Sequence, residues 1–453
     1  MKDKNNTNFK NKDNKKNNTK IHNSPSTPNN SSSTIHHSPF IIHHSSLVPK
    51  LRFPEFRDAG PWEVKRLGEV SPAIFDGTHQ TPKYTESGVP FFSVENIVSG
   101  IKNKFISKED YLEATKKNKP EKGDILLTRI GKIGVSAIVD WDYEFAIYVT
   151  LAVIKKSDQF IPYYLHLYFQ SERYQTEIHR RSLPNAVPCK INMDELKKTE
   201  VLLPSLPEQQ KIADCLSSLD ELIELQSKKL EALKAHKKGL MQKLFPCEGE
   251  TTPSLRFPEF RDAGPWEVKR LGEIFQERNV RNSSGLELLS VTLSDGVVKS
   301  SQLERKNNAS SDLSNYKKVY PNDIVYNSMR MWQGASGLSK WYGIVSPAYT
   351  VIKPLERQVS VFWKYYLKHP VSIEKFKSYS QGVTSDTWNL KFPAFSEIKL
   401  PIPNIPEEQQ KIADCLSSLD ELIEFQTKKL EALKAHKKGL MQQLFPSSDE
   451  VQV

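Results

Sequence analysis

The strongest constraint on the fold is a long stretch that occurs twice, at residues 208–246 and 408–446. The copies differ only at Leu225/Phe425, Ser227/Thr427 and Lys243/Gln443. Neither copy contains an internal Pro, and each ends at a Pro, which forces the residue before it out of the helical region. Each copy therefore predicts one uninterrupted helix of about ten turns.

The repeating positions of this helix have a period of 3.5 residues, which is typical of a coiled-coil seam. In the first copy they are Ile212, Leu216, Leu219, Ile223, Gln226, Leu230, Leu233, Lys237, Leu240 and Leu244. Eight of the ten are apolar. Ser205 with Glu208, and Asn404 with Glu407, have the spacing of capping boxes, so we expect the helices to begin there.

The charges along the stretch give the pair a direction. Residues 208–225 hold five acids and one Lys, whereas residues 227–243 hold six Lys and one Glu. An antiparallel pair within one chain places each acidic half against a basic half. The midpoint then predicts that Gln226 faces Gln426, with Lys237 near acids around Lys411–Leu416. The alternative is two homodimer seams, each pairing with another molecule.

A second repeat divides the rest of the chain. Leu51–Glu69 recurs without change as Leu255–Glu273. After its tail the chain is therefore two tandem units, 51–254 and 255–453, with the same opening and the same closing helix. Such duplication around an antiparallel coil predicts a pseudo-two-fold body.

The middles of the two units have diverged in sequence but keep one layout. Short β-branched and apolar runs between Gly turns predict buried strands. These runs are 124–129, 135–139 and 146–154 in the first unit, and 323–326 and 349–352 in the second. Helical segments are expected at 162–181 and 362–380, followed by extended stretches at 201–204 and 398–403. Each middle is predicted to be a mixed α/β domain.

Composition restricts the remaining possibilities. The net charge of +10 and the pI of about 9.1 point towards polyanionic partners. Residues 1–47 are dominated by Asn, Ser, Lys and His, so we expect a disordered tail. The four Cys show no metal spacing and indicate reduced thiols of a cytoplasmic protein. No apolar run is long enough to span a membrane.

Together these features resemble the specificity subunit of a type I restriction–modification system. The resemblance is carried by PEQQKIA and LEALKAHKKGLMQ in the helices, by LRFPEF and WEVKRLGE in the openings, and by their duplicated order. Asp76–Tyr84, DGTHQTPKY, also resembles a stretch near the start of many target-recognition domains. Unit two has Gln276–Asn282 instead. The expected domains are target-recognition domains at 51–204 and 255–403, and coiled-coil helices at 205–246 and 404–446.

The resemblance implies a DNA-recognition subunit of a larger complex. Such a chain reads double-stranded DNA at two half-sites separated by unspecified bases. It also holds two methylation subunits, and restriction subunits complete the assembly. S-adenosylmethionine, ATP and Mg are then expected on those partner subunits, with no cofactor and no metal on this chain.

The residues themselves give no sign of catalysis. There is no GxxxxGK[ST] loop, no GxGxxG loop and no [DN]PP[FYW] stretch in the sequence. We therefore predict that the chain is not an enzyme. Two alternatives stay open: a protein–protein adaptor that does not read DNA, and a DNA-modifying enzyme with an unrecognised active site.

Base reading favours Arg, Asn and Gln, while Lys, Ser and Thr suit phosphate contacts. Polar residues in Gly-punctuated segments are the candidates. In unit one they are Thr78, His79, Gln80, Lys83, Arg129, Lys132 and Asn185. In unit two they are Arg330, Gln333, Ser336, Lys340, Gln381, Thr384 and Ser385. Trp332, Tyr349 and Trp388 are interpreted as packing residues.

Overall fold

The computed structural model describes residues 47–101, 103–281, 285–303, 312–385 and 387–447. These residues belong to one compact unit of the chain. The predicted tail at 1–47 lies outside the described residues, except for Leu47.

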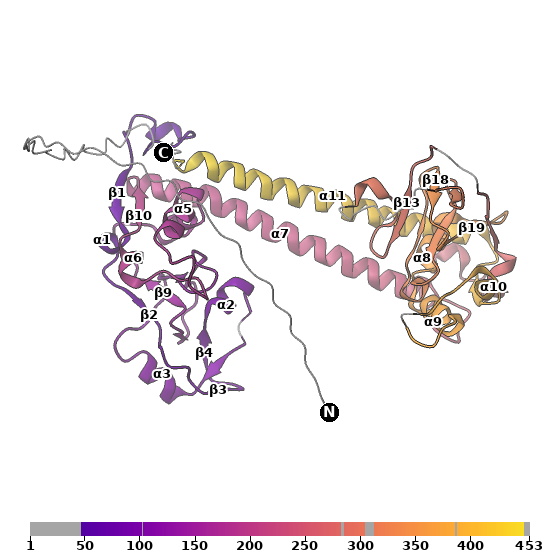
Figure 1. The fold of residues 1–453 in the computed structure, drawn as a ribbon, viewed down its shortest axis with the longest axis horizontal. Coiled ribbons are helices and arrows are strands. Elements are labelled where there is room, and N and C mark those ends of the chain that lie inside the picture. The colour runs from indigo at the N-terminus through magenta and orange to yellow at the C-terminus, as the bar shows by residue number, and fades with distance from the viewer. Residues whose placement is uncertain (1–46, 102, 282–284, 304–311, 386, 448–453) are drawn as a thin grey trace, which may run out of the picture. The chain divides into compact units, whose positions relative to one another are not determined.

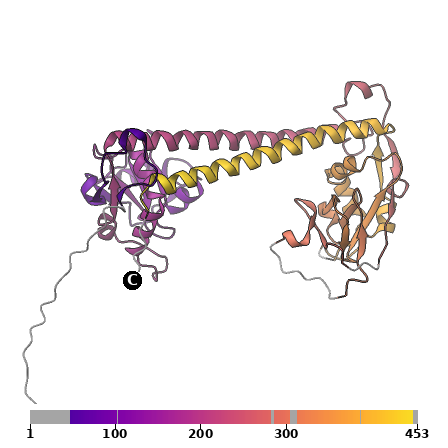
Figure 2. The same ribbon diagram turned by 90° about the horizontal axis from the view of Figure 1, so that it is seen from above.

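Two helices of 39 residues each, α7 (Leu206–Leu244) and α11 (Pro406–Leu444), lie side by side and antiparallel (Figures 1 and 2). Gln226 and Gln426 face each other, and the Gln226 amide donates to the side-chain oxygen of Gln426. The antiparallel coil within one chain and its predicted midpoint are confirmed.

The seam is also as predicted. All ten repeating positions of α7 are buried or half-buried, and so are their counterparts in α11. Leu225 and Phe425, one residue before the central Gln of each helix, are instead 64% and 63% exposed. Burial therefore follows the period of 3.5 and not hydrophobicity alone.

Lys237 meets a different acid from the one predicted. Its ammonium group pairs with Asp420, beyond the expected range Lys411–Leu416. Side chains on a helix lean towards its N-terminus. In an antiparallel pair this direction moves the Lys237 ammonium towards residues of α11 that lie further along the chain than Leu416.

The predicted capping boxes are wrong. Ser205 is the residue before α7, but its side chain caps no backbone N–H, and α11 is preceded by Ile405 and not by Asn404. Pro406 opens α11, where its fixed φ suits the first helical position. The Glu208 carboxylate is engaged by an Arg of the opening segment.

That segment forms a buried frame in each unit. Arg52 donates to both oxygens of Glu208 at 2.7 Å, and the Trp62 indole donates to the same carboxylate at 3.2 Å. Arg256, Glu408 and Trp266 repeat the arrangement with the same three distances. Glu208 and Glu408 are each 1% exposed. The frame thus explains why these residues occur in both copies.

The first domain is built on a four-stranded antiparallel sheet with the order β2-β9-β6-β7. A second sheet has the order β3-β5-β4-β8, and β1 pairs with β10. The strands are β1 (Glu63–Arg66), β2 (Ile74–Asp76), β3 (Tyr84–Thr85), β4 (Val89–Phe92), β5 (Phe105–Ile106), β6 (Ile125–Thr128), β7 (Ser136–Ile138), β8 (Ala146–Ile147), β9 (Leu151–Ile154) and β10 (Glu200–Leu203). The helices are α1 (Leu67–Val70), α2 (Val94–Ser99), α3 (Lys108–Ala114), α4 (Pro162–Phe169), α5 (Glu172–Arg180) and α6 (Met193–Lys197).

The second domain repeats the central sheet in the order β12-β19-β16-β17. Around it, β13 pairs with β14, β15 with β18, and β11 with β20. The strands are β11 (Glu267–Arg270), β12 (Phe275–Glu277), β13 (Leu289–Thr292), β14 (Gly296–Lys299), β15 (Lys317–Val319), β16 (Ile324–Asn327), β17 (Ser336–Leu338), β18 (Gly343–Val345), β19 (Tyr349–Pro354) and β20 (Lys399–Ile402). The helices are α8 (Ser360–Tyr366), α9 (Pro370–Tyr379) and α10 (Phe392–Ser396). The mixed α/β fold class is confirmed.

Three predicted segments are divided in the structure. The apolar run 146–154 is not one strand, because a turn separates β8 and β9, which belong to different sheets. The segment 162–181 breaks before Ser171, whose hydroxyl caps α5. The segment 362–380 breaks at Pro370, which cannot continue α8.

Each domain takes the beginning of one long helix and the end of the other into its core. Ile212 and Leu216 of α7 share the first core with Phe445, which follows α11. Ile412 and Leu416 of α11 share the second core with Phe245, which follows α7. The opening segment of each unit joins this pattern, because the Leu51 amide donates to the Gln443 carbonyl at 2.9 Å and the Leu255 amide donates to the Lys243 carbonyl at the same distance.

Candidate nucleic-acid interface

The segment after β2 is fixed to the edge of the first domain by a close backbone approach. A Cβ on Gly77 would lie 2.0 Å from the Ile147 carbonyl oxygen, so only Gly fits. Thr78 then exchanges backbone hydrogen bonds with Ile147 and Val149. The chain leaves this attachment into the segment that holds three exposed candidates, His79, Gln80 and Lys83. Thr78 itself is half-buried.

Arg129 lies beneath this segment rather than on its surface. It is 7% exposed, and its guanidinium donates to Asp76 at 2.9 Å, to the Val149 carbonyl at 2.9 Å and to the Ile191 carbonyl at 3.3 Å. Burial lowers the pKa of Arg129, and Asp76 opposes that shift. The structure thus disfavours Arg129 as a base-reading side chain and makes it a support for β2.

The other two candidates of unit one flank a loop held beside Arg129. Leu183 and Ile130 both bridge to Lys190, and the Gly131 amide donates to the Cys189 carbonyl at 2.8 Å. Lys132 and Asn185 are exposed, on opposite sides of this connection. Beside it lies a groove of about 610 Å³, lined by residues 131–136 together with Gln170, Gln175, His179 and Cys189. The structure therefore gathers loops 76–83, 129–136 and 183–190.

The second domain presents a corresponding loop. Gln381 and Asn389 exchange backbone hydrogen bonds of 3.1 and 2.8 Å, which close the loop between them. Gln381, Thr384 and Ser385 are exposed on it. Arg330, just before η6 (Met331–Gln333), and Gln333, the last residue of η6, are exposed as well. The rings of Trp332 and Trp388 pack edge to face at 5.2 Å and join these two segments. Both Trp side chains therefore have the packing role that was predicted.

Two candidates of unit two are placed differently. Ser336 is 2% exposed within β17, so the structure disfavours it as a contact residue. Lys340 is exposed but acts on the coil. The pKa of Glu424 on α11 is lowered first by a hydrogen bond from Lys428 and also by the charge of Lys340. The other twelve candidates, excluding Arg129 and Ser336, stay predictions.

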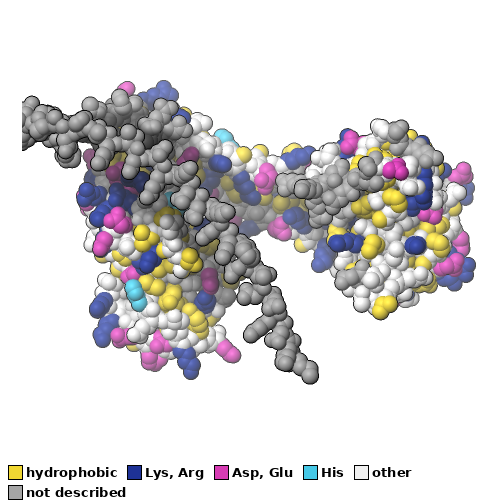
Figure 3. Space-filling view, in the orientation of Figure 1, with side chains coloured by type: hydrophobic (Ala, Val, Ile, Leu, Met, Phe, Trp, Pro, Cys, Tyr) yellow, Lys and Arg dark blue, Asp and Glu magenta, His cyan; other side chains and the backbone are white. Residues whose placement is uncertain are grey.

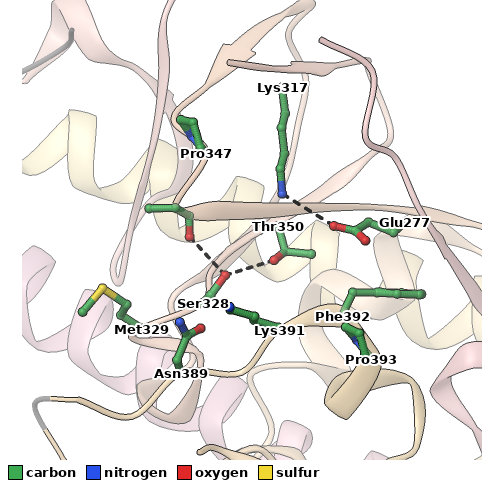
Figure 4. Close-up of a pocket in the computed structure, with 11 residues that line it drawn as sticks. Glu277, Lys317, Ser328, Met329, Pro347, Thr350, Asn389, Lys391, Phe392 and Pro393 are labelled. Carbon is green, nitrogen blue, oxygen red and sulfur yellow. Dashed lines mark hydrogen bonds and ion pairs between the residues drawn. The ribbon is translucent and has the colours of Figure 1, made fainter. Parts of the chain in front are cut away.

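Sequence reasoning missed a pocket of about 330 Å³ in the second domain (Figure 4). Ser328 follows β16 as Arg129 follows β6. The Ser328 carbonyl accepts a hydrogen bond from the Leu390 amide at 2.8 Å, and the Arg129 carbonyl accepts one from the Ile191 amide at 2.9 Å. Among the described residues, the Ser328 hydroxyl forms hydrogen bonds with Thr350 and with the Ala348 carbonyl, each at 3.0 Å. The pocket thus lies beside the residue that corresponds to Arg129 of the first domain.

Polar groups line this pocket. The Lys317 ammonium lies 3.5 Å from the Glu277 carboxylate and donates to the Tyr349 carbonyl at 2.9 Å. The buried side-chain oxygen of Asn389 has no hydrogen-bond partner among the described residues. An alignment of β6 with β16 could have indicated this pocket, because it places the small Ser328 at the position of Arg129. A single Ser in a sequence does not by itself predict a pocket.

The described residues offer no other kind of site. Among them, no three His, Cys, Asp or Glu side chains are grouped to hold a metal ion. No described helix is long and apolar enough to cross a membrane. Figure 3 shows Lys and Arg interspersed with Asp and Glu over both domains on the side in view, without one continuous basic face.

Comparisons with known proteins agree with the duplicated layout. Residues 60–235 and 264–435 match the family described as the type I restriction modification DNA specificity domain. The putative type I restriction enzyme MjaX specificity subunit of Methanocaldococcus jannaschii is 27% identical over 406 residues, which cover 84% of this chain and 92% of that protein. The MjaVIII specificity subunit of the same organism is 24% identical over 423 residues, covering 86% and 92%. The crystal structure of a type I S subunit from M. genitalium shares the fold, with a TM-score of 0.56 at 17% identity, covering 88% and 99%.

Proposed function

Because this chain belongs to the type I restriction modification DNA specificity family, we propose that each of its two domains reads one half of a bipartite DNA site. The observation that carries this proposal is the contrast between frame and loops. Both domains are mounted on the coil through the same Arg–Glu–Trp frame. The exposed loops they present differ in sequence and structure. Different loops on identical mounts are what two different half-sites require.

The contact surface proposed in each domain consists of its gathered loops. In the first domain these are 76–83, 129–136 and 183–190, with His79, Gln80, Lys83, Lys132 and Asn185 as exposed polar groups. In the second domain they are the residues beside η6 and the loop 381–389. Arg and Gln side chains suit base edges, while Lys and Thr suit phosphates.

We further propose that the coil determines the gap between half-sites and docks two methylation subunits. The near-identical helices offer two equivalent surfaces, and each exposes apolar side chains near the midpoint: Leu222, Leu225, Leu422 and Phe425. Exposed apolar groups of this kind favour a protein partner. Restriction subunits would complete the complex.

This chain would act without catalysis and without a cofactor of its own. S-adenosylmethionine, ATP and Mg would be bound by the partner subunits, and the complex would work on DNA in the cytoplasm. Interspersed charge favours weak DNA binding by the isolated chain, with tight binding only in the complex. Phosphate contacts should make that binding fall steeply with added salt.

A domain exchange tests the modular part of the proposal. Residues 75–200 are replaced by the equivalent segment of a family member that has another specificity, and methylated adenines are mapped across a genome. One half-site should change and the other should stay. A change in both half-sites, or in neither, contradicts the assignment of one half-site to each domain. Specific binding to random duplexes also separates DNA recognition from a purely adaptor role.

A deletion tests the coil as a ruler. Removing 223–229 and 423–429 takes one facing heptad from both helices and preserves the seam phase. The coil shortens by about 10 Å, equivalent to about 3 base pairs. The preferred gap should shorten by that amount while both half-sites are kept. A folded, active variant that retains the original gap would show that the helices are not the ruler.

A further inference from the structure

Besides its apolar core and the Glu208 frame, the first domain contacts the coil through a second carboxylate. Asp220 lies on α7, and its Oδ2 accepts a hydrogen bond of 2.8 Å from the Tyr163 hydroxyl on α4. The Lys437 ammonium on α11 donates to both oxygens of Asp220, at 2.6 and 2.7 Å. One side chain thus ties a helix of the domain to both helices of the coil. We refer to Tyr163, Asp220 and Lys437 as the first joint.

The second domain has a matching joint with one additional cation. Asp420 on α11 accepts a hydrogen bond of 2.6 Å from the Tyr365 hydroxyl on α8 and forms an ion pair with Lys237 of α7. Lys364 also donates to Asp420, at 2.9 Å. In the first domain the residue before the joint Tyr is Pro162, which has no such group. The second joint, Tyr365, Asp420, Lys237 and Lys364, therefore holds its carboxylate with three donors from side chains instead of two.

The joints are partly shielded from solvent. Lys437 and Asp220 are 16% and 36% exposed, and Lys237 and Asp420 are 22% and 31% exposed. Burial, and then the neighbouring Asp, raises the pKa of Tyr163 and of Tyr365, so both hydroxyls stay protonated and donate. Burial alone would raise the pKa of Asp420, but its hydrogen bonds from Lys237, Tyr365 and Lys364 lower it overall. Charge-assisted hydrogen bonds in such surroundings are directional and strong.

The helix that carries Tyr163 also contacts a candidate recognition loop, and the residues just after the helix that carries Tyr365 contact a turn of the second domain. His166 of α4 lies 2.9 Å from the Ser136 hydroxyl, at the end of loop 129–136. Lys368, just after α8, donates to the Leu293 carbonyl in the turn between β13 and β14, at 3.1 Å. Both α4 and α8 therefore lie between the coil and a loop of their own domain. A tilt of either helix moves the loops relative to the coil.

We propose that the two joints fix the angle between each domain and the coil and so restrict the gap that the protein accepts. This rests on the proposed function, because it assumes that both domains grip one duplex. Inserting one base pair moves a half-site by about 3.4 Å and turns it by roughly 35°. A domain that pivots on its core and frame could follow that displacement, whereas a domain that is also held by a directional joint on α4 or α8 could not. Asp220 and Asp420 act as positioning residues, and neither needs to touch DNA.

The test uses the full chain assembled with its methylation subunits. Methylation and binding are measured on duplexes that keep both half-sites and vary the gap by up to two base pairs. Asp220→Asn and Asp420→Asn should keep the half-sites. They should lower the ratio of the affinity for the best gap to the affinity for neighbouring gaps by ~10-fold, the size expected from losing one charge-assisted hydrogen bond. Asp420→Asn should have the larger effect, because it releases three donors.

Each helix provides a matched control. Glu231→Gln and Glu431→Gln remove the same charge eleven residues further along, from exposed pairs with Lys234 and Lys434. Both controls should retain the wild-type gap preference. Tyr163→Phe and Tyr365→Phe remove only a hydroxyl from each joint. They should widen gap tolerance in the same direction, even if an Asn variant fails to assemble.

The outcomes separate the two proposals. If the wild-type complex shows no gap preference at all, the proposed bipartite function is wrong, whatever the joints do. If wild type prefers one gap and the assembled Asn and Phe variants keep that preference unchanged, the joints do not set the angle. Equal widening in the Glu controls would likewise overturn the assignment, because it would trace the effect to coil charge.

Discussion

The frames and the middles of the two units differ sharply in how much they vary. Arg52, Glu208 and Trp62 have the same three hydrogen-bond distances as Arg256, Glu408 and Trp266. At the end of the central strand, by contrast, the first domain has a buried Arg129–Asp76 pair and the second has Ser328 beside a pocket. The mount is held constant while the presented surface changes. Recognition can therefore diverge without altering how a domain is attached.

The largest expected effect is on the frames, where the two units should behave alike. Glu208→Gln and Glu408→Gln each leave a buried Arg without its carboxylate, which should cost about 3–5 kcal/mol of stability. Hydrogen exchange measured peptide by peptide reports each domain separately and is suited to a protein with two cores. Glu55→Gln, in an exposed pair with Lys211, is the control and should change little. Clearly unequal costs at 208 and 408 would break the equivalence of the frames.

The middles should respond unequally. Arg129→Ala removes three hydrogen bonds and leaves Asp76 without its buried partner, so the first domain should lose about 2–3 kcal/mol. Ser328→Ala removes only the hydroxyl contacts to Ala348 and Thr350 and should cost about 1 kcal/mol. Local exchange protection measures both. Equal losses of stability in the two domains would contradict this difference between Arg129 and Ser328.

Acidification should destabilise the first domain through His166. Burial, and then the charge of Lys437, lowers its pKa from 6.5 to about 4, while Asp220 opposes the shift. The folded state therefore keeps His166 neutral, and its stability is complete above pH 6.5 and lost as pH falls towards 4. At pH 5.5 the loss should be about 1.4 kcal/mol.

A variant isolates that contribution. His166→Gln should flatten the pH dependence of exchange in the first domain between pH 6.5 and 5. The second domain retains its own dependence, because burial lowers the pKa of His369 to about 4 as well. If the first domain of His166→Gln still loses protection as steeply as wild type, His166 is not the titrating group.

The smallest effect is expected at the midpoint of the coil. Gln226→Leu with Gln426→Leu replaces a buried polar pair by apolar side chains that suit a seam, so stability should change by less than about 1 kcal/mol. The loss should be one of specificity, since a polar pair fixes register. Cysteine cross-linking across the seam should reveal slipped registers in the double variant, and a single register as in wild type would contradict this role.

The sequence predicted the parts whose information is local or duplicated. A strict 3.5 period, two copies and a charge gradient were enough to place Gln226 opposite Gln426. Sequence-based prediction failed where the role of a side chain depends on a residue far away in the chain. Nothing near Glu208 indicates that Arg52 will claim its carboxylate instead of a capping role, and Arg129 looks like an exposed reader until Asp76 is folded against it. The split of 146–154 was hidden because both halves are apolar.

The contact between Leu51 and Gln443 has a topological consequence. It reproduces the contact by which Leu255 follows α7, so the described chain closes on itself as though its two junctions were one kind of connection. Neither domain is then structurally first. A polypeptide that began at the second opening, ran through α11 and continued into the first would form the same set of contacts. The order of the two domains along the chain is thus a matter of where the ring was opened.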